Sequence, residues 1–329
     1  MDSLLVVAAV LQDEPGRWLL RRRPPGRIRA GEWEFPGGKL QSGETAHQAL
    51  CRKLREELGI EVLASEPLHS FCHQYPEVGL RLQVRRVLRW RGQPQAQEQQ
   101  QIDWFDSMSL QRLLLAAADG HIARLLRLPP LLYITPAMTA PDQTDSLLAS
   151  VRKALLLGAG LVYFRQSNLH AGQTLPWLQQ VAALCHQHAA GVVCNRELLD
   201  LPRLRNDGPP VDGIHLRAAE LPAAATDRHL LDWRLQHPQA LLGASCHDAS
   251  ELAMANHADC HYALIGPVKP TATHPDRPAL GWQQLCSIAA QSDLPLYALG
   301  GLQPADLDQA RAHGAYGVAG IRGFNAAVR

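Results

Sequence analysis

Eight short apolar runs recur through the second part of the chain, and they constrain its fold more than any other feature. The runs are LLYITP, GLVYFRQ, GVVCNR, GIHLRA, LLGASCH, YALIGPV, PLYALGG and GVAGIRG, which start near residues 131, 160, 191, 213, 241, 262, 295 and 317. Strands buried on both faces read as continuous apolar runs, and eight β/α units in about 200 residues are typical of a small (β/α)8 barrel. The pattern predicts such a barrel.

The first part of the chain has a different order of elements. Two apolar runs, at 4–11 and 17–23, flank the turn cluster DEPG at 13–16, which predicts a hairpin. A Gly-rich loop, GEWEFPGG, follows these runs. This part therefore reads as a unit that mixes strands and helices around one Gly-rich loop.

A long helix is expected after the Gly-rich loop. Ser42 or Thr45 can cap it, apolar residues recur every four positions, and Gly59 can close its end. Further strand-like runs at 68–75 and 79–91 precede a Gln-rich loop and a final helix near Ser109 to Leu126.

The length of 329 residues favours two folded units over one. Pro129-Pro130 ends the last helix of the first part, and the pattern changes after it. We therefore expect a two-domain α/β protein, with domains at 1–128 and 129–329.

Charge limits the partners that this chain can have. Thirty-two Lys and Arg residues against 31 Asp and Glu residues give a formal charge of +1, so no global field draws the protein to nucleic acid or to an anionic membrane. Any phosphate recognition must therefore be local, and we expect neither a stable nucleic-acid complex nor membrane binding.

Seven widely spaced cysteines contain no C-x-x-C pair, so neither a disulfide framework nor a zinc site is indicated. The apolar stretch near the start is far shorter than the roughly 20 residues that span a bilayer, and it reads as a buried strand. Both features predict a cytoplasmic protein with reduced thiols.

Glu56 and Glu57 lie on the helix that follows the Gly-rich loop. Positions 53, 56 and 57 are spaced i, i+3, i+4 and share one face, which brings the two carboxylates close enough for one hard cation. Mg²⁺ binds through one or two carboxylates plus substrate phosphates, which suits cleavage of a diphosphate linkage by activated water. The alternative is a solvated helix on which Arg52 and Glu56 form a pair worth about 0.2 to 0.5 kcal/mol.

The stretch GGKLQSGETAHQALCRKLREELGI, residues 37–60, resembles the Nudix box, G-x5-E-x7-R-E-U-x-E-E-x-G-U with U aliphatic. Its fixed positions are occupied by Gly38, Glu44, Arg52, Leu54, Glu56, Glu57, Gly59 and Ile60. The preceding GEWEFPGGK resembles the MutT branch, whose members hydrolyse oxidised purine nucleoside triphosphates such as 8-oxo-dGTP. The resemblance covers residues 1 to roughly 127 and implies an α/β/α sandwich with a mixed sheet.

The resemblance also implies the site residues of this half. Glu56 and Glu57 are expected to be catalytic and, with Gly38, to hold Mg²⁺ or Mn²⁺. A further glutamate from a later loop joins them in the family, and Glu98, in a stretch resembling E-G-Q-x-x-x-W, fits that role. The residues that lie where the MutT branch holds its purine are Arg23, Phe35 and Asp119, the last replacing a usual Asn.

One position departs from the box, because the first glutamate of the R-E-U-x-E-E run is Lys53. The change removes a metal ligand or base and adds a charge that repels Mg²⁺. At about 4 Å and an effective dielectric of about 20, each such interaction is worth roughly 4 kcal/mol. The Lys stem could also swing outward to water. We expect a retained fold and phosphate binding with weakened hydrolysis.

Glycines follow the last two strand-like runs of the predicted barrel. Gly300-Gly301 follows the seventh run, and Gly320 and Arg322 belong to the GIRG sequence after the eighth. Loops at these strand ends meet at one face of a barrel, where glycine lets backbone N–H groups approach a phosphate. The alternative is that these glycines only serve turns.

Residues 131 to 323 resemble the thiamine-phosphate synthase and TenI superfamily, which has the (β/α)8 TIM barrel fold. The segments that carry the resemblance are Tyr133-Ile134-Thr135, Arg165, Asn195, Gly213–Leu216, Gly243–His247, Gly266-Pro267-Val268, Thr271-Ala272-Thr273 and Gly300-Gly301. The resemblance implies that a phosphorylated ligand binds at Arg165, Asn195, Thr271, Thr273, Gly300, Gly301, Gly320 and Arg322.

Several synthase positions differ here: Ser167 replaces a Lys, Arg196 a metal-binding Asp, Glu220 the second metal Asp, and His274 a Lys. An arginine in place of a metal carboxylate argues against the synthase reaction. The TenI branch needs no metal, and its tautomerase uses a histidine for proton transfer, a position that His247 fits. His247 could equally be a barrel-rim residue without chemistry.

The sequence therefore predicts a MutT-type Nudix hydrolase joined to a TenI-like, phosphate-binding barrel. Its reaction would convert 8-oxo-dGTP to 8-oxo-dGMP and pyrophosphate, which implies a role in sanitising the nucleotide pool and in DNA repair. One alternative is a hydrolase of thiamine-related diphosphates coupled to a thiazole-phosphate site. The other is a catalytically weak phosphate-ligand binding protein, because of Lys53 and Arg196.

Overall fold

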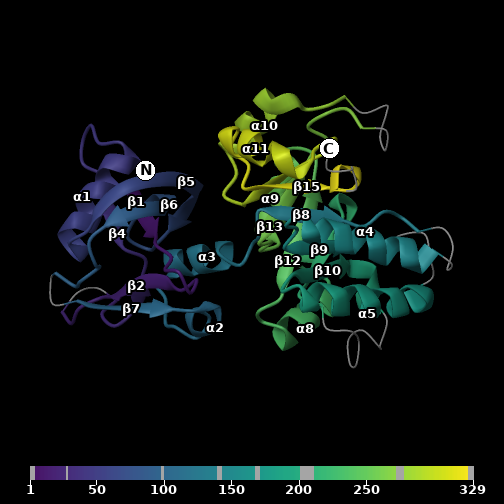
Figure 1. Ribbon diagram of the computed structural model, residues 1–329, viewed down its shortest axis with the longest axis horizontal. Helices are drawn as coiled ribbons and strands as arrows, with labels where there is room; N and C mark the ends of the chain where they lie inside the picture. The colour runs from purple at the N-terminus through teal and green to yellow at the C-terminus, as the bar shows by residue number, and fades with distance from the viewer. Residues whose placement is uncertain are drawn as a thin grey trace. The chain divides into compact units, whose positions relative to one another are not determined.

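A computed structural model of the chain describes residues 4–26, 29–97, 100–138, 143–166, 171–200, 211–271 and 278–324. The chain divides into two compact units, Met1–Arg127 and Leu128–Arg329 (Figure 1). Each unit has its own hydrophobic core.

The N-terminal unit contains two sheets. The first is mixed, with the strand order β4-β1-β6-β5, and its strands span Gly37–Lys39, Leu4–Val10, Gly79–Arg91 and Glu61–Gln74. Only the β1–β6 pair in it is parallel. The second sheet is antiparallel with the order β3-β2-β7, and its strands span Trp33–Glu34, Trp18–Arg22 and Gln101–Phe105.

The predicted hairpin between the first two strands forms only at its turn. Gln12 and Trp18 make an isolated antiparallel bridge, and beyond it β1 and β2 enter different sheets. Because β1 finds a parallel partner in β6 and β2 an antiparallel partner in β7, long-range pairing overrides the local pattern.

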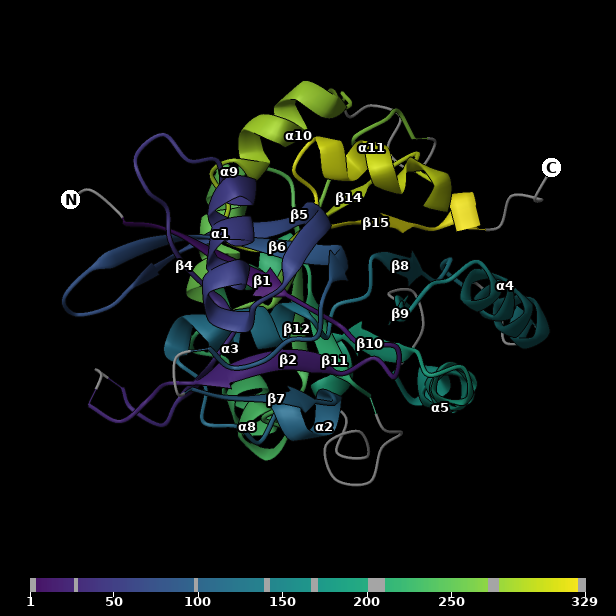
Figure 2. The same ribbon diagram turned by 60° about the vertical axis from the view of Figure 1, so that its left-hand side comes forward.

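Helix α1, Ala46–Leu58, packs on the mixed sheet (Figure 2). Thr45 rather than Ser42 is its N-cap, because the Thr45 side chain accepts a hydrogen bond from the Gln48 N–H and the Gln48 side chain accepts one from the Thr45 N–H. Gly59 closes the helix in the left-handed conformation, with φ 66°. The buried face of α1 includes Leu50 and Leu54.

The single helix expected near 109–126 is wrong, because two helices occupy this region. They are α2, Ser107–Leu110, and α3, Ala117–Leu125. Trp33 interrupts the helix: its N–H donates to the carbonyl of Leu114, and its carbonyl accepts from the N–H of Ala116. Pairing with β3 thus takes the backbone groups that a continuous helix would need.

The second unit is a closed parallel barrel with the strand order β8-β9-β10-β11-β12-β13-β14-β15. These strands span Leu131–Ile134, Leu161–Phe164, Gly191–Asn195, Gly213–Leu216, Leu241–Cys246, Tyr262–Ile265, Leu296–Leu299 and Gly317–Gly320. Each coincides with one of the eight apolar runs, so the predicted (β/α)8 barrel and the two-part α/β fold class are confirmed.

Helices cover the outside of the barrel, as Figure 1 shows for α4 and α5 beside β8, β9 and β10. The α-helices are α4 Thr144–Leu156, α5 Ala171–Gln187, α7 Leu221–Ala224, α8 Arg228–Gln236, α9 Ala249–His257, α10 Gly281–Ala289 and α11 Leu307–Ala312. Short 3₁₀ turns follow strands or precede helices. They are η2 Arg196–Asp200, η3 Ala218–Glu220, η4 Pro304–Asp306 and η5 Arg322–Phe324. Among the residues described, no helix is both long and apolar enough to cross a membrane.

Replacing Thr45 with alanine removes one half of the reciprocal cap on α1. We expect the free energy of opening α1 to fall by about 1 kcal/mol, measured as faster amide hydrogen exchange of residues 46–58 in the full chain. Ser42→Ala is the matched control, because Ser42 is exposed and lies outside the cap. Equal exchange in Thr45→Ala and wild type would contradict the capping role.

Candidate functional site

The N-terminal unit contains a cavity of about 510 Å³, here called the base pocket. The predicted residues Arg23, Phe35, Asp119 and Gly38 all line it. The pocket is also lined by Tyr75, a residue that the sequence analysis did not single out. An Arg and a Tyr far apart in the sequence give no local motif, so only the fold reveals that Arg29 Cζ lies 3.6 Å from the centroid of the Tyr75 ring.

Asp119 is fixed in this pocket by the backbone of Phe35, whose N–H donates to Asp119 Oδ1 over 2.7 Å. Burial raises the pKa of the Asp119 carboxyl to about 7, even though Arg23 opposes the shift. Arg23 itself pairs with Glu34, with 2.6 Å between Nε and Oε2. Asp119 can therefore change its protonation state close to neutral pH.

Glu57 lies beneath the Gly-rich loop and is buried. Its Oε2 accepts from the Gly37 N–H over 3.2 Å, and its Oε1 lies 3.0 Å from Arg21 Nη1. Burial raises the pKa of Glu57 to about 7 against the opposing charge of Arg21. Arg21 also contacts Glu34 over 2.9 Å, and neither Arg21 nor Glu34 was singled out from the sequence.

Glu56 faces outward, with 44% of its side chain exposed. Lys53 Nζ lies 2.9 Å from Glu56 Oε2, and this ammonium lowers the pKa of the Glu56 carboxyl. The Lys53 stem crosses Gly38 closely, because a Cβ added at Gly38 would lie 2.8 Å from Lys53 Cε. Arg52 binds Glu44 with two contacts of 2.7 Å.

The two helix carboxylates therefore have different partners: Glu57 is paired inward with Arg21, and Glu56 outward with Lys53. Glu98, the expected third ligand, lies outside the described residues. Within the described part of the chain, no group of three or more His, Cys, Asp or Glu side chains is arranged to hold a metal ion.

The barrel contains a second cavity, of about 380 Å³, at the carboxyl ends of its strands, here called the barrel pocket. Every described residue predicted to bind ligand there lines it, together with the predicted proton-transfer residue: Arg165, Asn195, His247, Thr271, Gly300, Gly301, Gly320 and Arg322. Thr273 lies outside the described residues. Among the described lining residues three are arginines and none is Asp or Glu. This charge suits an anionic ligand.

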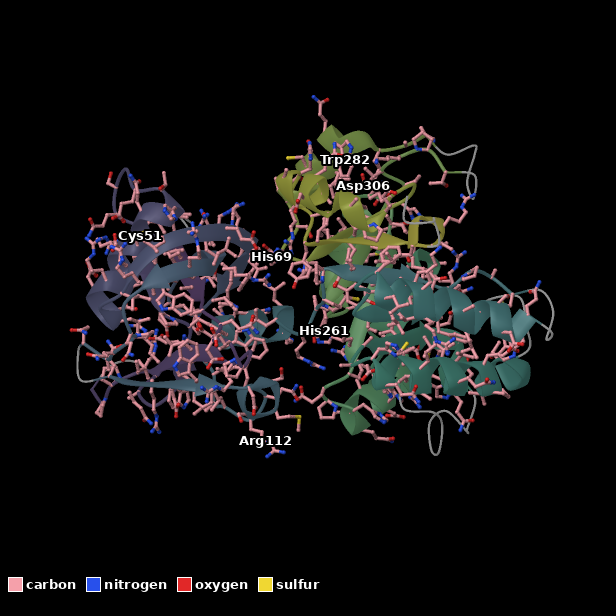
Figure 3. The ribbon with its side chains drawn as sticks, viewed as in Figure 1. Cys51, His69, Arg112, His261, Trp282 and Asp306 are labelled. Carbon is pink, nitrogen blue, oxygen red and sulfur yellow. The ribbon has the colours of Figure 1, made fainter. Side chains whose placement is uncertain are left out.

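The glycines of the barrel pocket permit close backbone packing. Gly301 has φ 66°, and a Cβ added there would lie 2.8 Å from the Cβ of Lys269. Lys269 Nζ is held 2.9 Å from Asp306 Oδ1 and lies 5.8 Å from the centroid of the Trp282 ring. Figure 3 labels Trp282 and Asp306 beside each other in the barrel unit. The wall behind Gly301 is therefore fixed by an ion pair and an aromatic ring.

Arg196, which the resemblance places at the position of a metal-binding Asp, does not line the barrel pocket. Its guanidinium binds Asp227 over 2.5 and 2.8 Å and Asp200 over 2.7 Å. Glu220 is likewise occupied, because it accepts from Arg217 over 3.0 Å. The other two departures, at positions 167 and 274, lie outside the described residues.

His247 has a fixed partner in Glu251. Its Nδ1 lies 2.8 Å from Glu251 Oε2, which also accepts from the His247 backbone N–H over 2.6 Å. Because a carboxylate only accepts, this contact favours the tautomer with a proton on Nδ1 and a lone pair on Nε2. His247 thus has the form that a general base requires.

His215 lies in the barrel core; the sequence analysis included it only in the segment Gly213–Leu216 that carries the resemblance, and not as a site residue. Burial, with a smaller contribution from Arg165, lowers its pKa to about 3, so it is neutral. Its ring contacts Tyr262 and Ser245, and Ser245 lines the barrel pocket. The available signal was a polar residue inside an apolar strand run.

Comparison with known proteins gives two family matches. Residues 131–324 match the family model described as thiamine monophosphate synthase, and residues 6–125 match the NUDIX domain model. The thiamine-phosphate synthase of Parasynechococcus marenigrum is 35% identical over 181 residues, which are 55% of this chain and 48% of that protein. The chain spans about half the length of the first thiamine-phosphate synthases that it matches.

Two relatives match the first unit. The CTP pyrophosphohydrolase of Escherichia coli is 38% identical over 119 residues, which are 36% of this chain and 87% of that protein. The 8-oxo-dGTP diphosphatase of Proteus vulgaris is 37% identical over 91 residues, which are 28% of this chain and 81% of that protein.

The adjacent glycines 37 and 38 provide a test of the packing beneath the base pocket. A Cβ at Gly37 would lie 2.1 Å from the carbonyl oxygen of Val7, whereas one at Gly38 would meet only the flexible Lys53 stem. We expect Gly37→Ala to lower the free energy of unfolding of the N-terminal unit by about 3 kcal/mol, and Gly38→Ala by about 0.5 kcal/mol. Urea unfolding followed by hydrogen exchange measures both, and equal losses would refute this packing.

Proposed function

Because the chain belongs to the Nudix family through residues 6–125 and to the thiamine monophosphate synthase family through residues 131–324, we propose a pyrophosphohydrolase that carries a phosphate-binding barrel. Its substrate is a nucleoside triphosphate, and 8-oxo-dGTP is the first candidate. The observation that carries this proposal is the base pocket, in which Arg23, Phe35 and Asp119 lie beside Gly38 of the box. The named activity of the Proteus vulgaris relative supports it.

In this reaction water attacks a phosphorus atom of the triphosphate, and the P–O bond to the leaving group breaks. The products are a nucleoside monophosphate and pyrophosphate. The base pocket holds the base between apolar walls and the polar groups of Arg23 and Asp119. The cationic residues that line it offset the charge of a bound nucleotide, and they are Arg21, Arg23, Arg29 and Lys39.

The carboxylates of Glu56 and Glu57 supply hard oxygen ligands, which suit Mg²⁺ or Mn²⁺ in kind. A bound divalent ion would neutralise phosphate charge and lower the pKa of the attacking water. Glu57 is pre-positioned by Gly37 and Arg21, whereas Glu56 becomes available only when Lys53 leaves it. We propose Glu98 as a further ligand, and Lys53 as the residue that limits the rate.

Replacing Lys53 with glutamate tests this proposal directly. We expect metal-dependent pyrophosphate release from 8-oxo-dGTP to rise by about 10² or more, because a removed acid/base group is restored and a repelling charge is lost. Arg55→Glu is the matched control, since it makes the same charge change on an exposed residue of α1.

Both variants and the wild type are assayed as the full chain with Mn²⁺, and with thiamine diphosphate as a second substrate. Equal rates in wild type and Lys53→Glu would contradict the role of Lys53. Preference for thiamine diphosphate would replace the nucleotide assignment. Nucleotide binding without product in wild type would favour the catalytically weak binding protein.

A second candidate substrate is a cytosine nucleotide, and Asp119 favours it. An ionised carboxylate only accepts hydrogen bonds. Where Asp119 faces the exocyclic group of the base, it can therefore bind the N4 amine of cytosine but not the O6 acceptor of a 6-oxopurine. The Asp119 oxygen that does not bind Phe35 is the one available to a base. The Escherichia coli relative is named a CTP pyrophosphohydrolase, which agrees with a contact between Asp119 and the N4 amine of cytosine.

The protonation of Asp119 gives this choice a pH dependence of known sign. Below its pKa of about 7, the neutral carboxyl can donate to a 6-oxo group, and above it the ionised form accepts from an amine. We expect the ratio of kcat/KM for CTP to that for 8-oxo-dGTP to rise by about tenfold from pH 6 to pH 8. Asp119→Asn, which does not titrate, should abolish the rise and favour 8-oxo-dGTP. A ratio that is flat in wild type would contradict this reading.

For the barrel we propose a metal-independent site for a small phosphorylated molecule. Gly300, Gly301, Gly320 and Arg322 bind its phosphate, and His247 moves a proton. The absence of any Asp or Glu among the described residues of the barrel pocket supports this view, because a Mg²⁺–diphosphate complex needs carboxylate ligands.

A further inference from the structure

Three polar side chains form a hydrogen-bonded line behind the barrel pocket. The Tyr262 hydroxyl lies 3.1 Å from His215 Nδ1, and His215 Nε2 lies 2.9 Å from Ser245 Oγ. Tyr262 and His215 are fully buried, whereas Ser245 is partly exposed and lines the barrel pocket. The line thus runs from the barrel core to the surface that a ligand would meet.

The strands around this line are shaped to hold it. A Cβ at Gly243 would lie 2.1 Å from Tyr262 Cζ, so the Tyr262 ring lies across the bare backbone of β12. On the other side the Tyr163 ring packs on His215, with 4.2 Å between the ring centroids. His215 therefore cannot turn to exchange its partners without moving a packed ring.

Hydrogen-bond satisfaction fixes the direction of the line. A phenol always carries one donor, and within the described part of the chain His215 Nδ1 is the acceptor paired with the Tyr262 hydroxyl. If Nδ1 carried the proton instead, the buried Tyr262 hydrogen would lose its acceptor, at a cost of about 1 to 3 kcal/mol. The proton therefore sits on Nε2 and is donated to Ser245 Oγ.

The hydroxyl hydrogen of Ser245 then has no acceptor among the residues described. The Ser245 Oγ atom accepts from His215 Nε2, and the Ser245 side chain has no other hydrogen-bond partner among the residues described. We propose that Tyr262, acting through His215, turns the Ser245 hydroxyl into a fixed hydrogen-bond donor aimed at the ligand of the barrel pocket. Tyr262 and His215 are positioning residues, and Ser245 touches the ligand.

This donor complements His247, which follows the end of β12 and offers a lone pair on Nε2. Ser245 and His247 both line the barrel pocket. The barrel pocket thus pairs one donor with one acceptor. It would take a phosphorylated molecule that presents an acceptor atom to Ser245 and a transferable proton to His247, an assignment that rests on the phosphate site proposed above.

The first measurement reads the tautomer of His215 in the full chain at pH 7, from the nitrogen resonances of ¹⁵N-histidine, assigned with His215→Gln. We expect the Nε2–H form in wild type. Tyr262→Phe keeps the ring but removes the donor, so His215 should shift to the Nδ1–H form. Ser245→Ala should leave the Nε2–H form, since Tyr262 still donates. Tyr297→Phe, which removes another buried barrel hydroxyl, is the control without effect.

The second measurement titrates inorganic pyrophosphate, with EDTA present, and follows the same His215 resonances so that only the barrel site is observed. We expect about fivefold weaker binding in Ser245→Ala and in Tyr262→Phe, the equivalent of about 1 kcal/mol, and no further loss in the double variant. Additive losses of affinity in the double variant would overturn the proposal. It would also be overturned if, in Tyr262→Phe, His215 kept the wild-type tautomer and pyrophosphate bound with unchanged affinity. Expected tautomers with no response to pyrophosphate would support the fixed donor and refute the phosphate site.

Discussion

A partly buried guanidinium holds the N-terminal site together. Arg21 on β2 contacts Glu34 on β3 and Glu57 on α1, so one cation joins the antiparallel sheet to the helix that carries the box. Removing one member of such a buried group costs about 3 to 5 kcal/mol, because a charge is left without compensation. The position of Glu57, and the path of the Gly37 backbone above it, both depend on this contact.

The second charge contact of the site is of a different kind. Lys53 and Glu56 are 25% and 44% exposed in their side chains, and exposed pairs contribute only about 0 to 1 kcal/mol. For the Lys53–Glu56 pair this smaller free energy applies, and not the roughly 4 kcal/mol that an effective dielectric of about 20 gives for two charges at 4 Å. Separating Lys53 from Glu56 therefore costs little free energy. This favours a hydrolase with a reduced rate over a protein that can no longer bind metal at this site.

The sequence predicted what depends on local pattern and on residues at fixed offsets. The eight barrel strands follow from the apolar runs alone, and the family resemblance implied that Arg165, Asn195 and Arg322 bind one ligand, which agrees with their lining one pocket. Pairing between distant segments could not be read in this way, so β1 and β2 were placed in one hairpin although they join different sheets. Side-chain direction was equally hidden: Arg196 turns to Asp227, and His215 finds Tyr262, through contacts that only the closed barrel creates.

The two phosphate sites proposed above differ in the charge of the side chains assigned to them. In the first unit the box carboxylates need a cation before a triphosphate can approach, and Lys53 already offers one on Glu56. In the barrel pocket the cations are arginines, and the two positions at which the resemblance implies a metal-binding Asp hold Arg196, which binds Asp227, and Glu220, which binds Arg217. The functions proposed above therefore assign a divalent ion to the first unit only. In the site proposed for the barrel, the chemistry comes from oriented hydrogen bonds, and burial keeps His215 neutral so that its contact with Ser245 stays the same as the pH changes around neutrality.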